Sequence, residues 1–178
     1  MTIMSRATTA LTSLIVCSGV ALAHHDGPPQ PGPEHQKLAR FVGKWSGSGD
    51  MKPGPFGPGG KMNWTETCEW FPGNFHIVCN SSSSGPSGEV KGISILGYDA
   101  ASKMYTYYGV DNTGQGDYAK GTVQGKIWTY QSVTTIEGKT IKSRFVIDAV
   151  SDVLHKFKWE MSQDGATWST LMEGQSNK

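Results

Sequence analysis

The 178-residue sequence lacks a second long apolar run after its N-terminal segment, has only three cysteines, and carries no excess of charge of either sign. A membrane-spanning helix needs about 20 apolar residues in a row, and no segment of the chain reaches that length. Lysine and arginine together number 16, against 15 aspartates and glutamates. Because this balance leaves no basic block, the composition argues against nucleic acid or an anionic membrane surface as a partner.

Motifs of known catalytic chemistry are also missing. The sequence contains no nucleophile elbow, phosphate-binding loop, zinc-ligand spacing or pair of neighbouring carboxylates. We therefore assign no catalytic residues, and the sequence favours a non-enzymatic protein.

The first 23 residues have the three parts of a cleavable signal peptide. Arg6 supplies the positive charge, residues 10–20 form an apolar run broken only by small residues, and residues 21–23 (Ala-Leu-Ala) place small side chains where a signal peptidase inspects them. This pattern predicts an exported protein, periplasmic or secreted. One alternative is a buried first helix. Another is a lipoprotein signal ending at Cys17, which the preceding Val16 and the continuing apolar run disfavour.

The rest of the chain is predicted to form one domain. Residues 24–33 are rich in proline and glycine, so we expect a disordered tail there. Residues 34–178 are long enough for a single domain with its own core. At its start, residues 34–41 have helical spacing, with Leu38 and Phe41 on one side, and predict a short helix.

After this helix, apolar and polar residues alternate with the period of two that is typical of strands. Turn residues such as Gln124-Gly125 separate the runs, so neighbouring strands should pair as hairpins. Residues 52–60 and 82–88 are predicted to be long loops. The pattern predicts an all-β, antiparallel up-and-down barrel, because closure removes exposed sheet edges. About ten strands are expected, at residues 45–51, 62–71, 75–81, 90–98, 104–110, 117–123, 126–134, 139–148, 153–161 and 167–173.

Two cysteines remain if the signal is removed, and an even number in an exported chain favours a disulfide. A two-residue turn at Gly73-Asn74 places Trp70 opposite Ile77 and Cys68 opposite Cys79. Opposed Cβ atoms lie about 4.5–5.5 Å apart, which small strand adjustments bring within bonding range. The sequence therefore predicts a Cys68–Cys79 bridge, with two reduced, buried cysteines as the alternative.

Residues 43–49 form a GxWxGxG motif directly after the short helix. This motif resembles the first strand of calycin-type barrels, including lipocalins, and its longer form looks like nitrobindin and its relatives. Residues 97–99 and 103–105 are similar to the central hairpin of a bacterial domain-of-unknown-function family of exported barrels. The similarity covers most of residues 34–173 and implies a lipocalin-like fold, without a settled activity. A structural role is expected for the motif residues Gly43, Trp45, Gly47 and Gly49.

His155 lies in a strand whose odd positions are apolar, so it should face the interior beside Phe157 and Trp159. An inward imidazole can bind haem iron or another metal, and nitrobindin-like barrels hold haem through a late-strand histidine. The resemblance therefore makes haem a candidate cofactor and His155 its candidate ligand, although the histidine-containing ending of that family is missing here. The alternative is a hydrogen-bonded interior histidine.

Further inward candidates follow from the same alternation. Glu66 shares a face with Trp64 and Cys68, and an inward carboxylate needs a partner such as His155 or Arg144. The alternative is an outward Glu66. Aromatic pairs at period two form either a core or the wall of a pocket. The candidate ligand-binding residues are Trp64, Glu66, Tyr105, Tyr107, His155 and Trp159.

Three functions are compatible with the predicted barrel and its inward-facing side chains. The first is non-catalytic binding of a small apolar or amphipathic molecule inside the barrel, which rests on fold analogy and the aromatic inner face. The second is a haem protein that handles small oxidants through His155. The third is a barrel filled by its own side chains that acts as a structural or interaction module.

Overall fold

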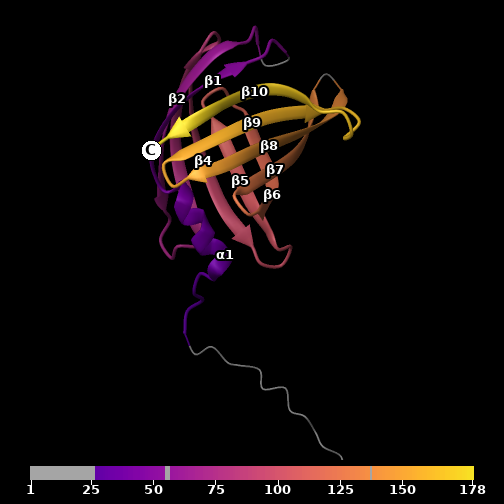
Figure 1. The fold of residues 1–178 in the computed structure, drawn as a ribbon. Coiled ribbons are helices and arrows are strands. Elements are labelled where there is room, and N and C mark those ends of the chain that lie inside the picture. Colours follow the sequence, from indigo (N-terminus) through magenta and orange to yellow (C-terminus); the bar gives the residue numbers. More distant parts are fainter. Residues whose placement is uncertain (1–26, 55–56, 137) are drawn as a thin grey trace, which may run out of the picture.

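The computed structural model describes residues 27–54, 57–136 and 138–178. The predicted signal peptide, including Cys17, and the first three residues of the predicted tail lie outside the described residues. Within the described part, the expected short helix is present as α1 (Pro33–Gln36) followed by the 3₁₀ helix η1 (Lys37–Phe41). These helices lie at one end of the barrel, at the bottom of Figure 1. No helix in the described ranges is long and apolar enough to cross a membrane.

The strands form a closed antiparallel barrel in the order β1-β10-β9-β8-β7-β6-β5-β4-β3-β2, so every strand pairs with its neighbours in sequence. The predicted all-β, up-and-down barrel of about ten strands is therefore confirmed. The strands are β1 (Gly43–Met51), β2 (Gly60–Trp70), β3 (His76–Gly85), β4 (Gly88–Asp99), β5 (Met104–Asp111), β6 (Gly116–Gln124), β7 (Ile127–Ile136), β8 (Lys139–Ser151), β9 (Leu154–Ser162) and β10 (Ser169–Asn177).

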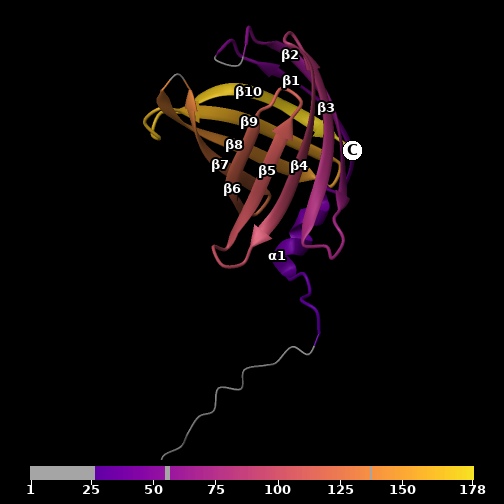
Figure 2. The ribbon, with the colours of Figure 1, turned by 180° about the vertical axis from the view of Figure 1, so that it is seen from behind.

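The barrel closes where its first strand meets its last. β1 pairs with β2 on one side, with Trp45 opposite Glu66, and with β10 on the other, with Gly47 opposite Ser176. The two views in Figures 1 and 2 show β1 and β10 running side by side. Because the first strand follows η1 directly, the helical segment is held against the end where β1 begins.

One predicted loop is wrong. Residues 82–88 were expected to form a long connection, but β3 continues to Gly85 and β4 starts at Gly88. The two strands pair up to Gly85 opposite Gly88, which leaves a tight turn of two residues. Gly88 has a φ of 103°, a conformation that favours glycine. The serines of this segment are therefore strand residues, and alternate ones face the barrel interior.

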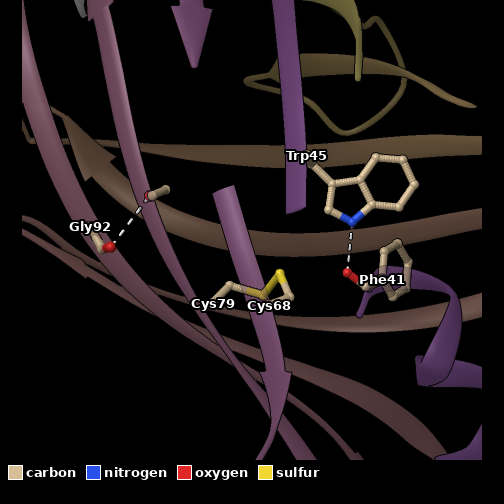
Figure 3. Close-up of a disulfide and its surroundings, with 6 residues drawn as sticks. Phe41, Trp45, Cys68, Cys79 and Gly92 are labelled. Carbon is tan, nitrogen blue, oxygen red and sulfur yellow. Dashed lines mark hydrogen bonds between the residues drawn. A yellow bond between two sulfur atoms is a disulfide. The ribbon is translucent and has the colours of Figure 1, made fainter. Parts of the chain in front are cut away.

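The predicted disulfide is present between β2 and β3. Cys68 lies opposite Cys79 and Trp70 opposite Ile77, as the sequence predicted. The cysteine Cα atoms are 4.0 Å apart, and both side chains are buried. Figure 3 shows the bridge between the adjacent strands. The bridge thus anchors the hairpin close to the end of the barrel that carries the helices.

Candidate functional site

The interior of the barrel differs between its two halves. Near the helices it is filled: Leu38 and Phe41 of η1 insert between the strands and join one continuous core. This part is called the closed half. Its main buried members are Leu38, Phe41, Cys68, Ile77, Cys79, Leu96, Tyr105, Ala119, Trp128, Tyr130 and Ala149.

The GxWxGxG motif begins β1 in the closed half, with Gly43 opposite Cys68, and continues through Gly47, opposite Trp64. The Trp45 indole is 5% exposed, and its Nε1 donates a hydrogen bond to the carbonyl oxygen of Phe41 at 2.8 Å (Figure 3). A Cβ on Gly47 would overlap the Trp64 ring, and one on Gly49 would lie 2.5 Å from the Glu173 carbonyl oxygen. Both positions therefore need glycine for close approach of the neighbouring groups.

His155 lies in the closed half, where its ring is only 6% exposed. It stacks on Trp45 with ring centroids 4.2 Å apart, and the edge of Phe41 contacts it at 5.4 Å. Burial, and then the positive charges of Arg40 and Lys178, lower the pKa of His155 to about 4. The imidazole is therefore neutral at pH 7 and packs as part of the core.

Tyr105 also belongs to the closed half. It is 2% exposed, and its hydroxyl donates a hydrogen bond of 2.6 Å to the Glu34 carboxylate. Burial, and then this carboxylate, raise the pKa of Tyr105 above its usual range. Tyr105 thus ties α1 to the barrel, in the same half as His155.

The half of the barrel away from the helices has a different lining. Here β2, β8 and β9 each carry at least one aromatic side chain in phase with the inner face, and these aromatic residues are partly exposed, whereas Ile141 and Ser143 on the same face of β8 are buried. The Phe157 ring contacts Trp64 at 5.3 Å and stacks on Phe145 at 5.0 Å. We call this set the aromatic wall: Trp64, Phe145, Phe157 and Trp159.

Hydrogen bonds fix the two indoles of the aromatic wall. Trp64 Nε1 donates to Ser176 Oγ at 3.0 Å, and Trp159 Nε1 donates to Ser143 Oγ at 3.1 Å. Each indole N–H is therefore satisfied by a serine hydroxyl. Such amphipathic rings are well suited to contact an apolar molecule.

The strands on the other side of this half carry small inward residues. Along β3, β4 and β5, serine and glycine occupy successive inward positions, and most of them are partly exposed. These residues are Ser81, Ser83, Gly85, Gly92, Ser94 and Gly109. We call the half of the barrel that holds these small residues and the aromatic wall the open half.

Glu66 and Tyr107 point into the barrel between the closed half and the opening. The position opposite Glu66 on β1 is Trp45, and on β3 it is Ser81. Burial raises the pKa of the Glu66 carboxyl. Burial, and then the nearby charge of Glu66, raise the pKa of Tyr107 to about 12. Of the two orientations considered for Glu66, the structure shows the inward one.

Family comparison gives a clear result. A family model described as "Protein of unknown function (DUF1579)" matches residues 30–178. The chain belongs to the DUF1579 family. No curated protein matches the sequence. The crystal structure of Rv2717c from M. tuberculosis is similar to this one, with a TM-score of 0.56 at 11% identity, covering 84% of this chain and 99% of that chain. At this identity the likeness shows the fold alone.

The predicted site residues of this DUF1579 protein fall into two groups. Trp64, Glu66, Tyr107 and Trp159 lie on the inner face from the middle of the barrel to its opening, whereas Tyr105 and His155 lie in the closed half. Phe145 and Phe157 were not among the predicted ligand contacts. Their signal was present in the sequence, because each shares the apolar face of its strand with a predicted candidate or a core residue.

Neither metal candidate fits a metal site in this DUF1579 protein. Ligand atoms of Glu66, Cys68 and Cys79 lie within 4.8 Å of one another, but both sulfurs are used by the disulfide and cannot act as thiolate ligands. A haem needs a free line of approach to a histidine nitrogen and space for the porphyrin plane. Trp45 covers one face of His155, and Nε2 is fully buried. The residues present therefore do not fit haem.

Two hollows of about 510 Å³ lie elsewhere on the described surface. One crosses the outer face of β1, β8, β9 and β10 and carries balanced lysine and acidic side chains. The other lies beside η1 and is lined by Arg40, Trp128, Asp152 and Lys178 among others. The first hollow reaches Phe157 of the aromatic wall, but neither is lined by any of the six predicted ligand-binding residues.

Proposed function

We propose that this protein binds a small apolar or amphipathic molecule in the open half of its barrel without transforming it. The proposal rests on one observation: the aromatic wall, whose residues are partly exposed, shares the half of the barrel away from the helices with a row of serines and glycines. Removing apolar surface from water contributes about 25 cal/mol per Å². A ligand that covers these rings gains this contribution and leaves the closed half undisturbed.

The GxWxGxG motif and its resemblance to calycin-type barrels support the same proposal, since ligands of such barrels enter at the mouth. Export to the periplasm or the cell exterior is part of the proposal as well. The signal-like N-terminus supports it, and so does the Cys68–Cys79 bridge, because structural disulfides persist in oxidising compartments.

Blocking the open half should weaken binding. Ser83 faces inward opposite Trp64, whereas the next residue, Ser84, is exposed on the outer face. We expect wild-type protein to raise the fluorescence of the neutral probe N-phenyl-1-naphthylamine to saturation. Ser83→Trp should weaken this binding at least tenfold, because the new indole occupies the space beside Trp64.

Ser84→Trp serves as the matched control and should bind the probe as wild type does. Native mass spectrometry of freshly purified protein provides an independent readout, in which a co-purified small molecule is expected for wild type and not for Ser83→Trp. Equal probe binding by both tryptophan variants would contradict a site in the open half. Absence of any probe binding or co-purified mass would instead favour a barrel that serves as a structural or interaction module.

The haem alternative leads to a separate expectation. Because His155 is enclosed by Trp45 and Phe41, we expect haem added to the purified protein to give the same absorption spectrum with wild type and His155→Ala. A Soret band of wild type that is lost in His155→Ala would show that the imidazole does reach iron, and would restore haem binding as the function.

A further inference from the structure

The inner face of the barrel holds a carboxylate without a compensating charge. Among the described residues, Glu66 takes part in no hydrogen bond and no ion pair. Arg144, one partner considered from the sequence, instead pairs with Glu160 at 2.6 Å and lies over the Trp168 ring at 4.2 Å. His155, the other, is neutral at pH 7 because its pKa is about 4.

Lysines do not compensate Glu66 either. In the described strands they occupy outward positions, as Lys61, Lys91 and Lys158 do, each in an ion pair with an acidic neighbour. Lys139 occupies an inward position by the alternation of β8, but it is the first residue of this strand, at the end of the barrel away from the helices, and it is exposed. Asp111 and Asp117 act on Tyr107 together with Glu66, so the charged groups that influence this inward tyrosine are all acidic.

The groups around Glu66 define what it can bind. On the adjacent strands its neighbours are the uncharged Trp45 and Ser81, and the titratable group facing it from across the barrel is Tyr107. Trp64, which lies two residues before Glu66 on the same face of β2, belongs to the aromatic wall. A buried carboxylate without a partner is unfavourable until a positive group pairs with it, and aromatic faces attract the same group.

We propose that the ligand of the open half is an organic cation, an amine or quaternary ammonium with an apolar body, whose charge meets Glu66 while its body covers the aromatic wall. This inference rests on the proposed function and names its ligand class. A bare metal ion is excluded as the occupant of this cluster by the oxidised state of Cys68 and Cys79, which leaves Glu66 as a single ligand.

The test uses two probes of equal shape and different charge. Benzyltrimethylammonium and neopentylbenzene differ only in the replacement of the charged nitrogen by carbon. We expect wild type to bind the cation at least tenfold more tightly, measured by quenching of tryptophan fluorescence. Glu66→Gln should lose this preference, with a tenfold or larger drop for the cation and little change for the hydrocarbon. Glu69→Gln, on the exposed outer face of the same strand, is the matched control and should behave as wild type.

A stability measurement separates a binding role from a structural one. Because burial raises the pKa of Glu66, the ionised carboxylate destabilises the folded protein above that pKa, and the effect disappears when the group is protonated. Glu66→Gln should therefore melt at the same or a higher temperature than wild type at pH 8, and at about the same temperature near pH 4. A variant that melts lower at pH 8 would show that Glu66 stabilises the fold, and would overturn the inference.

The binding outcomes also separate the two proposals. If both probes bind wild type equally and Glu66→Gln changes neither affinity, the ligand class is wrong while the binding function stands. If neither probe binds and no small molecule co-purifies, the proposed function fails, and the ligand class fails with it.

Discussion

Replacing Phe41 by alanine is expected to lower the free energy of unfolding by about 3–5 kcal/mol, the range for large aromatic truncations in a core. Phe41 is 7% exposed and contacts Trp128 at 4.9 Å between ring centroids, in an edge-on arrangement. Its carbonyl oxygen also accepts the hydrogen bond from the Trp45 indole. The packing of η1 in the closed half and the position of Trp45 in β1 therefore both depend on Phe41. Chemical denaturation followed by tryptophan fluorescence measures the change.

The same substitution should alter the titration of His155. With the Phe41 ring removed, water reaches the imidazole, so its pKa should rise from about 4 towards the ordinary value for histidine. A pH titration followed by nuclear magnetic resonance detects this shift. Lys37→Ala, in the same helix but in an exposed ion pair, is the control and should change stability by under about 1 kcal/mol. A Phe41→Ala protein as stable as this control would show that the packing of Phe41 from η1 into the barrel does not stabilise the fold.

Removing the disulfide is the second change with a large expected effect. The Cys68→Ala/Cys79→Ala double variant should lose about 3 kcal/mol, because the bridge closes a loop with a sequence separation of 11 and restricts the unfolded chain. For a domain of this size the loss corresponds to a drop in melting temperature of roughly 6–12 °C. Thermal unfolding followed by circular dichroism measures it.

A reducing agent provides the control for the disulfide. Dithiothreitol should lower the melting temperature of the wild type by a comparable amount and leave the double variant unchanged. The single variants Cys68→Ala and Cys79→Ala should resemble the double variant, because each breaks the same bond. If reduction leaves the wild type as stable as before, the bridge contributes nothing beyond the packing of its sulfurs.

The fold was predictable because alternation and turn residues act over short distances. The Gly73-Asn74 centre predicted the β2–β3 register, although the observed loop is longer, with Phe71 N–H donating to the His76 carbonyl oxygen at 2.9 Å. The prediction of a loop at residues 82–88 was wrong because serine and glycine are typical of loops. Here they occupy strand positions, since the interior opposite the aromatic wall requires small side chains.

The candidate site was only partly predictable, for a geometric reason. Alternation identifies which face a residue occupies, but not its height along the barrel, which depends on strand tilt and stagger. Tyr105 and Tyr107 share a face in sequence, yet one is fixed to Glu34 in the closed half and the other lies near Glu66. The outer face of β4 and β5 is also less polar than the alternation predicts, because Ile93, Tyr108 and Val110 are exposed on it.

The seam between β1 and β10 determines when the molecule can finish folding. Every other ladder joins neighbouring strands, whereas this one pairs residues about 120–130 positions apart, such as Ser46 with Asn177. Contacts this distant form late, because a long chain must first be brought together. During synthesis the growing sheet therefore keeps two unpaired edges until its last strand emerges, and that is the stage at which it is most open to pairing with other chains.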